Sequence, residues 1–373
     1  MIMGANVHTS PVLTNYTDSY CDSLISDISD ISDVVGELKK RKENVGMSDR
    51  NASSSAFGWD FQVNSAILLM LENIKDAKRV RVEGADEDIE ITLQDQTKIY
   101  AQAKAVEKPD DTSHVIDKLT KALETLSDAA KKGDGSLFTY VTNSSNPFNN
   151  QRTLSYFTGR THLGFDELPD AAQQKINEIV QNKGYTDLDV HKLDVRVIPF
   201  YGNDLKNRYK EILACVNEFL SEVNVDVQGI NTEIMGIWQK DLFQNATQSD
   251  TAISISKEKM IWPLIVLVVD KTAASEYKKD FNDDEIGEVE RKYKMIINQN
   301  TMSYDMISRV LSDHRKSKKA QKQFVADQWG DYLDIVSTIE ADDDTKESLV
   351  KIILSRILTQ RQYIRDIKRG ANL

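Results

Sequence analysis

The stretch VEGADEDIEITLQDQTKIYAQAKAVEK, residues 82–108, decides the fold of this chain. Apolar and polar residues alternate in DIEITL and again in KIYAQAKAV, which is the period of a half-buried strand. The polar tetrapeptide QDQT separates the two runs, so they are predicted to form a β-hairpin. One face of the second strand carries Gln102 and Lys104, where an ordinary strand of a sheet core would carry apolar residues.

The alternation places several polar side chains on one surface of this hairpin. Asp88 and Glu90 point to the same side of the first strand, and Gln102 and Lys104 are expected to lie beside them on the second strand. Glu83 arrives from the strand that precedes the hairpin. Because neighbouring strands are about 4.8 Å apart, these groups can converge on one cation.

This set of residues has a chemical use. Carboxylate and amide oxygens are the ligands that Mg²⁺ prefers, and such an ion polarises a phosphodiester and activates a water. Lys104 would stabilise the charge that develops on the phosphate. The simpler interpretation is a solvated hairpin face with scattered charges, because a Gln and a Lys two positions apart often occur by chance. The order of elements around the hairpin favours the metal site.

The composition is that of a globular protein. The chain has 373 residues, of which 40% are hydrophobic and 28% charged, enough for about two domains. The net charge of -12 argues against a protein that coats nucleic acid by itself, although a local basic groove remains compatible. Cys21 and Cys215 imply no disulfide framework and no metal site, which favours a reducing cytoplasm. The start of the chain lacks signal-peptide features, and the longest apolar run, residues 261–269, is too short to span a bilayer.

Residues 1–54 are predicted to form a mobile N-terminus that holds an amphipathic helix and a linker. The apolar residues of this helix recur at steps of three and four: Leu24, Ile28, Ile31, Val35 and Leu38. This seam either packs on the core of the chain itself or mediates self-association or partner binding, and the sequence leaves both open. Residues 45–58 have the composition of a linker.

Residues 55–225 are predicted to form the first folded domain. The expected order is helix 56–77, strand 78–84, the hairpin, helix 113–133, strand 136–143, a helical insertion, strand 193–202 and a helix to about residue 223. That order predicts an α/β fold in which helices flank a mixed sheet. The apolar side of the helix over 113–133 is expected to face the core; it comprises Leu119, Leu123, Leu126 and Ala130.

Residues 226–373 are predicted to form a mostly helical domain for partner binding or oligomerisation. The run MIWPLIVLVVD, residues 260–270, fits either a strand or a buried helix. A basic cluster follows at residues 309–322, and it is either a solvated helix face or a contact for a DNA backbone or a partner. No nucleotide-binding G-x-x-x-x-G-K-[ST] motif occurs, so any ATP-driven step must come from another chain.

Several segments together resemble a known family, the double-stranded-DNA endonuclease effectors of bacterial anti-phage systems such as CBASS. The segments are, in order, GWDFQVNSAILLML, VEGADEDIEI, YAQAKA, FTYVTNS and VRVIPFYGNDLKNRYKEIL. These effectors carry an N-terminal nuclease domain of the PD-(D/E)xK superfamily. The resemblance covers roughly residues 55–225 and implies a restriction-endonuclease-like fold, a Mg²⁺ or Mn²⁺ cofactor and a double-stranded DNA substrate.

The resemblance also implies the site residues. The family's metal and catalytic positions match Asp88, Gln102 and Lys104, while Glu83 matches an accessory acid and Gln62 a polar residue of the first helix. The superfamily's usual Glu is Gln102 here, and a neutral amide oxygen should lower the affinity for the metal. The Q-x-K variant is familiar among nucleases of this superfamily, so an active site is expected.

The partners follow from the layout of the whole chain. Some effectors of this family carry a C-terminal α/β sensor for cyclic oligonucleotides, which residues 229–373 do not resemble. The layout is similar to the nuclease subunit of Lamassu-type defence complexes, which implies an SMC-like ATPase, a small accessory subunit and self-association in the active state. Two other functions stay open, a catalytically inactive nuclease-fold subunit that binds DNA or protein, and a restriction-type endonuclease.

Overall fold

The computed structural model describes residues 50–108, 111–202, 204–271, 287, 289, 291–293 and 304–373. The chain divides into two compact units, Met1–Phe57 and Gly58–Leu373, and the fold described below is that of the second. The N-terminal seam from Leu24 to Leu38 lies outside the described residues, so its role stays a prediction. None of the helices in the described parts of the chain is long and apolar enough to cross a membrane.

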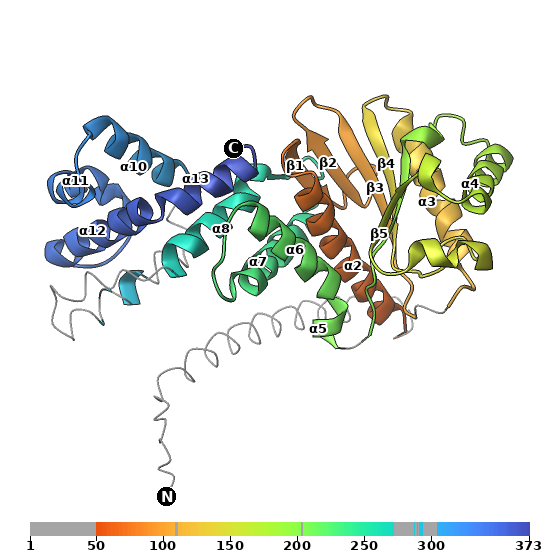
Figure 1. Ribbon diagram of the computed structural model, residues 1–373, viewed down its shortest axis with the longest axis horizontal. Helices are drawn as coiled ribbons and strands as arrows, with labels where there is room; N and C mark the ends of the chain where they lie inside the picture. Colours follow the sequence, from red (N-terminus) through yellow and green to blue (C-terminus); the bar gives the residue numbers. More distant parts are fainter. Residues whose placement is uncertain are drawn as a thin grey trace, which may run out of the picture. The chain divides into compact units, whose positions relative to one another are not determined.

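Within the described residues, seven strands form one mixed sheet in the order β5-β6-β4-β3-β2-β1-β7 (Figure 1). The strands are β1 (Ala77–Val82), β2 (Ile89–Leu93), β3 (Lys98–Lys104), β4 (Gly135–Thr142), β5 (Thr161–Gly164), β6 (Leu193–Val197) and β7 (Ile255–Ser256). The pairs β3–β4 and β4–β6 are parallel, and the remaining neighbours are antiparallel. The predicted mixed sheet with flanking helices is confirmed.

Helices surround this sheet and make up most of the chain after it. Those that belong to the sheet region are α2 (Arg50–Glu72), α3 (Val115–Ala130), α4 (Asp170–Lys183), α5 (Leu205–Arg208) and α6 (Lys210–Glu222). The later ones are α7 (Ile230–Ala246), α8 (Lys257–Lys271), α10 (Tyr304–Ser317), α11 (Gln321–Gln328), α12 (Asp343–Thr359) and α13 (Arg361–Gly370). Short 3₁₀ turns connect several of them, at Gln151–Phe157, Phe165–Glu167, Val190–Lys192 and Trp329–Val336. The predicted helical C-terminal region is therefore confirmed.

The hairpin of β2 and β3 forms as predicted. Ile89 lies opposite Ala101 and Ile91 opposite Ile99, so the two apolar sets share one face. In the turn, the backbone N–H and the hydroxyl of Thr97 both donate to the Asp95 carboxylate, at 2.9 and 2.7 Å. This local bonding satisfies the polar groups of the turn without any partner from another element.

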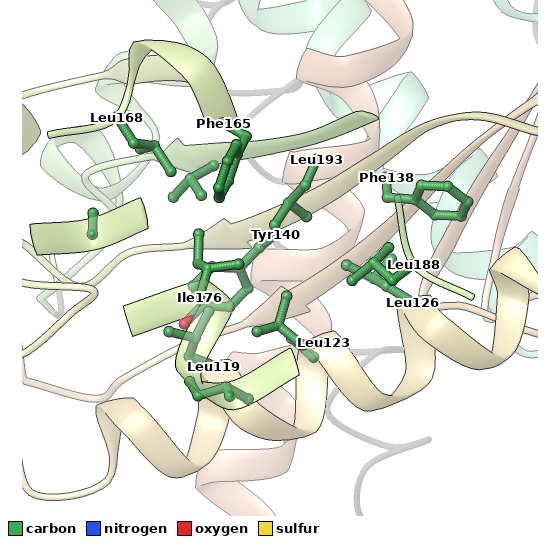
Figure 2. Packing of buried hydrophobic residues seen from close by; sticks show 14 of the residues in the cluster. Leu119, Leu123, Leu126, Phe138, Tyr140, Phe165, Leu168, Ile176, Leu188 and Leu193 are labelled. Carbon is green, nitrogen blue, oxygen red and sulfur yellow. The ribbon is translucent and has the colours of Figure 1, made fainter. Parts of the chain in front are cut away.

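Both faces of β3 are buried, whereas the alternating sequence had suggested a half-exposed strand. The strand β4 runs parallel to β3, and the crossover between them is α3, which covers the face of Tyr100 and Gln102. Figure 2 shows the apolar core on this face, where α3 and Ile176 of α4 meet Tyr140 and Leu193 of the sheet. The core-facing residues predicted on α3 are confirmed: Leu119, Leu123 and Leu126 are fully buried, and Ala130 packs against them.

The opposite face of the sheet is covered by α2. Arg196 points to this face from β6 and forms an ion pair with Glu72 at the end of α2. The middle of α2 is apolar on all sides, and Ile67, Leu69 and Met70 are completely buried. The sheet thus lies between two helical layers, α2 on one side and α3 with α4 on the other (Figure 1).

Three elements differ from the sequence expectation, and a fourth that the sequence left open is resolved. Residues 50–57, expected in the linker, belong to α2, and the insertion expected to be helical contains β5, which pairs antiparallel with β6. The strand β6 ends at Val197 instead of residue 202, because Pro199 lacks the N–H that a continued ladder requires. The undecided run at 260–270 is helical, within α8, and buried on nearly every side.

The helical region after residue 225 is attached directly to the sheet. The short strand β7 pairs with β1, with Ile255 opposite Val80. The buried ammonium of Lys257 donates to the carbonyls of Ile74, Lys75 and Asn372 at 3.0 to 3.3 Å. The predicted domain boundary at 225/226 stays a prediction, but the edge strand β7 of the sheet comes from beyond it.

Candidate active site

Asp88 is the centre of the polar group at the end of the hairpin. Its Oδ2 atom accepts a short hydrogen bond from the Gln102 amide, one from the Ala103 N–H at 3.0 Å and one from the Lys104 ammonium at 3.4 Å. Asp88 precedes β2 and the other residues end β3, so the antiparallel register brings them together. The three principal site residues predicted from the sequence therefore converge.

Gln102 is held from its other end by α3. Its Oε1 atom accepts a hydrogen bond of 2.7 Å from the Thr125 hydroxyl, and only 3% of the residue is exposed. A hydroxyl can donate or accept, so a half-turn of the amide would keep the bond to Thr125 and direct the oxygen of Gln102 toward Asp88. The buried amide can therefore present to a cation the oxygen that the sequence predicts as a ligand.

Glu83 approaches the same group from the end of β1. Its backbone is in the left-handed region, with φ at 53°, which is unfavourable for a residue other than glycine and is common at functional sites. Burial, followed by the charge of Asp88, raises the pKa of the Glu83 carboxyl, and Gln62 and Lys104 oppose that rise. Glu83 and Gln62 are thus part of the predicted site.

Gln62 reaches this site from α2, on the far side of the strand ends. Its Oε1 atom is buried and accepts no hydrogen bond among the described residues. An amide oxygen without a partner costs about 1–3 kcal/mol unless a ligand or water bonds to it. All five residues predicted for the site are therefore brought together from α2, β3 and the loop between β1 and β2.

Glu87 was missed as a site residue by the sequence analysis. Only 4% of it is exposed, and neither carboxylate oxygen has a hydrogen-bond partner in the described part of the chain. Burial, followed by the charge of Asp88, raises its pKa to about 8, while Thr125 and Lys104 lower it. No pattern in the sequence distinguishes Glu87 from its acidic neighbours, because this residue lies in a loop where strand alternation does not apply.

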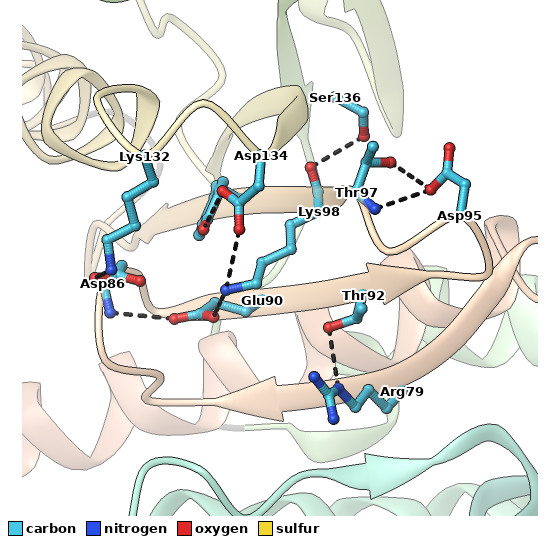
Figure 3. Close-up of polar contacts among 11 residues, drawn as sticks. Arg79, Asp86, Glu90, Thr92, Asp95, Thr97, Lys98, Lys132, Asp134 and Ser136 are labelled. Carbon is cyan, nitrogen blue, oxygen red and sulfur yellow. Dashed lines mark hydrogen bonds and ion pairs between the residues drawn. The ribbon is translucent and has the colours of Figure 1, made fainter.

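Glu90 does not join this group, contrary to the expectation from alternation. Figure 3 shows it engaged elsewhere, with Lys98 at 3.4 Å and the backbone N–H of Asp86 at 3.1 Å. Lys132, after α3, forms an ion pair with Asp86, and Lys98 also approaches Asp134. These contacts fix the loop that carries Glu87 and Asp88 against α3.

The oxygen atoms of the site are of the kind that binds a cation, but in this structure Asp88 is occupied by hydrogen bonds to its neighbours. No group of three or more His, Cys, Asp or Glu side chains in the described residues is arranged to hold a metal ion. A cation at Asp88 would thus rely on the Gln102 amide and on water to complete its ligands. Gln62 and Glu87 have unpartnered oxygens that could also bind this cation or its water.

Access to the site is from its edge and not through a deep pocket. The side chains of Lys104 and Asp88 are 28% and 16% exposed, whereas Gln102 lies beneath them. Two surface pockets lie elsewhere, one along residues 224–231 and one between Glu72 and His162. A phosphodiester on the outside of a duplex needs an exposed edge and no enclosed cavity, so this position is compatible with DNA.

The basic cluster at residues 309–322 is partly neutralised by nearby carboxylates. Arg309 pairs with Asp334 at 2.8 Å, and Lys319 pairs with Asp327 at 2.9 Å. Three exposed cations of the cluster form no ion pair within the described residues: Arg315, Lys318 and Lys322. Its contact with DNA or a partner stays a prediction.

Comparison with known proteins gives only distant structural likeness. No protein-family model and no curated protein matches the chain. A structure of the Cap4 SAVED/CARF-domain containing receptor of Acinetobacter baumannii, with the cyclic trinucleotide 3'3'3'-cAAA, has 14% identity and a TM-score of 0.35 and covers 57% of this chain and 45% of that chain. A further structure of the same receptor has 14% identity and a TM-score of 0.35, and the match covers 57% of this chain and 47% of that chain. This chain thus spans less than half the length of the receptor that it matches.

Proposed function

We propose that this chain is a Mg²⁺- or Mn²⁺-dependent double-stranded DNA endonuclease. The observation that carries the proposal is the convergence of Gln102 and Lys104 on one carboxylate oxygen of Asp88. A carboxylate, an amide oxygen and a lysine at one strand end are the groups that phosphodiester hydrolysis needs. The positive φ of Glu83 supports a functional role for the same corner of the sheet.

Each residue has a separate role in this proposal. Asp88, the rotated amide of Gln102 and Glu83 would hold the cation, which supplies a polarised phosphate and a water of lowered pKa. The ammonium of Lys104 neutralises Asp88 at 3.4 Å and, being partly exposed, can turn toward a phosphate oxygen when DNA binds. Gln62 offers its unpartnered oxygen to the water or to the ligand shell.

The biological setting is also part of the proposal. The resemblance of residues 55–225 to anti-phage effector nucleases, followed by a helical region, supports an effector subunit of a Lamassu-like defence complex. An SMC-like ATPase and a small accessory subunit would control it, because an unregulated endonuclease would cut the chromosome of its host. Self-association would bring two nuclease sites together for a cut in both strands.

The test is plasmid cleavage by the purified chain, alone and with the proteins that co-purify with it. We expect cleavage with Mg²⁺ or Mn²⁺, none in EDTA, and a loss of at least about 100-fold for Lys104→Ala, which removes the cation at the phosphate. Lys78→Ala is the matched control, because this lysine is exposed on the neighbouring strand β1 of the same sheet. Equal activity of Lys104→Ala and wild type would refute the site, and DNA binding without any cleavage would favour the inactive nuclease-fold subunit.

A further inference from the structure

Glu87 is a buried carboxyl without a hydrogen-bond partner among the described residues. Its residue is 4% exposed, and Thr125 and Lys104, which act on its charge, form no hydrogen bond to its oxygens. A buried polar group without a partner is rare, and a buried carboxylate is stable only when it is paired, protonated or bound to a cation. Unless it stays protonated, Glu87 therefore needs a positive partner that the described residues do not supply.

The loop around Glu87 is built to direct it inward. The Gly84 N–H donates to the Glu87 carbonyl at 3.0 Å, and the Glu83 N–H donates to the Asp88 carbonyl at 2.8 Å, which closes a tight turn. A side chain at position 84 would push the Glu90 carboxylate away from its present place, so glycine leaves room for that contact. Lys132 holds Asp86 on the outside of the same loop (Figure 3). This turn fixes the side chain of Glu87 under α3.

The surroundings of Glu87 belong to the proposed site. Asp88, Thr125 and Lys104 are the groups that act on its charge, and Thr125 is the residue that bonds to Gln102. Lys104 already donates to Asp88, so it does not neutralise both carboxylates. A divalent cation between Glu87 and Asp88 would remove the repulsion between the two carboxylates. It would also offset the cost of burying the charge of Glu87.

We infer that Glu87 is a ligand of the divalent cation, together with Asp88 and the amide oxygen of Gln102. This inference rests on the proposed function and adds to it the ligand that compensates for the neutral Gln102. Asp88, Glu87 and the Gln102 amide would supply three hard oxygen ligands, and Glu83 with water would complete an octahedral shell. Glu87 thus restores the negative charge that the superfamily's usual Glu would have supplied at position 102.

The test is Mn²⁺ binding to the full chain, measured by calorimetry and by the rise in melting temperature on adding Mn²⁺. Glu87→Gln keeps the shape but removes the charge, and we expect its dissociation constant for Mn²⁺ to rise by at least about tenfold, as the loss even of groups that only orient a ligand costs about 10- to 100-fold. Without metal the variant should be as stable as wild type or more so, because the amide has the shape of the carboxyl and carries no charge to bury. Glu124→Gln, which changes an exposed carboxyl of α3, should bind Mn²⁺ like wild type.

The outcomes separate this inference from the proposed function. If Glu87→Gln binds Mn²⁺ as wild type does while Asp88→Asn does not, the cation site stands and Glu87 is no ligand. If wild type binds no Mn²⁺ and cleaves no DNA, both ideas fail. If Glu87→Gln is less stable than wild type in the absence of metal, the carboxyl has a structural role, and Glu87→Asp is the deciding variant. Mn²⁺ binding restored in Glu87→Asp supports Glu87 as a ligand. Mn²⁺ binding as weak as in Glu87→Gln overturns the inference.

Discussion

At the scale of single residues, the site depends on a hydroxyl that the sequence did not single out. Thr125 donates to Gln102 at 2.7 Å and lies beside Glu87, so it connects the two residues that surround Asp88. Its hydroxyl also lies 3.1 Å from the carbonyl oxygen of Ala122, an alternative acceptor for its single proton when the Gln102 amide is turned. Thr125 is a positioning residue, because it acts on the cation site through the amide of Gln102.

Thr125→Val should therefore raise the metal requirement without unfolding the protein. The swap conserves shape but leaves the end of the Gln102 amide that faces α3 without a hydrogen-bond partner, which costs about 1–3 kcal/mol. We expect the Mn²⁺ concentration for half-maximal cleavage to rise about tenfold, with a smaller effect on the maximal rate. Metal titrations of plasmid cleavage measure both quantities.

Thr120→Val is the matched control for this experiment. Thr120 lies on the same helix and bonds only to the carbonyl of Ile116, at 2.8 Å. It should keep the metal requirement of wild type, so an equal shift in both variants would show that loss of a helix hydroxyl, and not release of Gln102, caused the effect.

At the scale of elements, one arginine connects the helical region to the site. Arg81 of β1 is 4% exposed, and its guanidinium donates to the carbonyls of Asn245, Gln248 and Ile253 at 2.7 to 3.0 Å. Its Nε atom donates to the carbonyl of Glu83 at 3.2 Å. The segment from α7 to β7 thereby supports the left-handed backbone of Glu83.

Arg81→Lys should weaken this support, because an ammonium cannot replace the planar fork that reaches four carbonyls. We expect the free energy of unfolding to fall by about 2 kcal/mol, from buried carbonyls left without donors. Well below the melting temperature, the variant should still need several times more Mn²⁺ for cleavage than wild type, since Glu83 is less well held. Thermal unfolding and metal titration test the two effects separately.

Arg79→Lys serves as the comparison for that variant. Arg79 lies two residues earlier in β1, is exposed, and donates to Thr92 at 3.2 Å (Figure 3). If Arg79→Lys raises the Mn²⁺ requirement as much as Arg81→Lys does, the connection through Glu83 is wrong.

At the scale of the whole molecule, charge should limit DNA binding by the isolated chain. The net charge is -12, and part of the basic cluster on α10 and α11 is neutralised by Asp334 and Asp327. We expect weak binding to duplex DNA at physiological salt, and a fall of about tenfold or more in affinity between 50 and 200 mM salt. Fluorescence anisotropy with a labelled duplex measures this, and tight binding that does not change with salt would contradict it.

The sequence by itself determined the hairpin and most of its neighbours. The period of two in β2 and β3, the polar turn at residues 94–97 and the apolar stripe of α3 are local signals, and each matches the structure. Because register follows from the same alternation, the sequence also placed Asp88 beside Gln102 and Lys104. The resemblance to nucleases, and not periodicity, added Gln62 from a distant helix.

Only the tertiary structure decided what surrounds those residues. That α3 covers Gln102, that Glu87 turns inward and that Glu90 turns to Lys98 depend on contacts between segments far apart in the chain. The strand β7 is two residues long, too short to carry a period, and it exists because the edge of β1 offers it hydrogen bonds. Alternation states which face a side chain takes, but the burial of that face depends on which helix the rest of the chain packs against it.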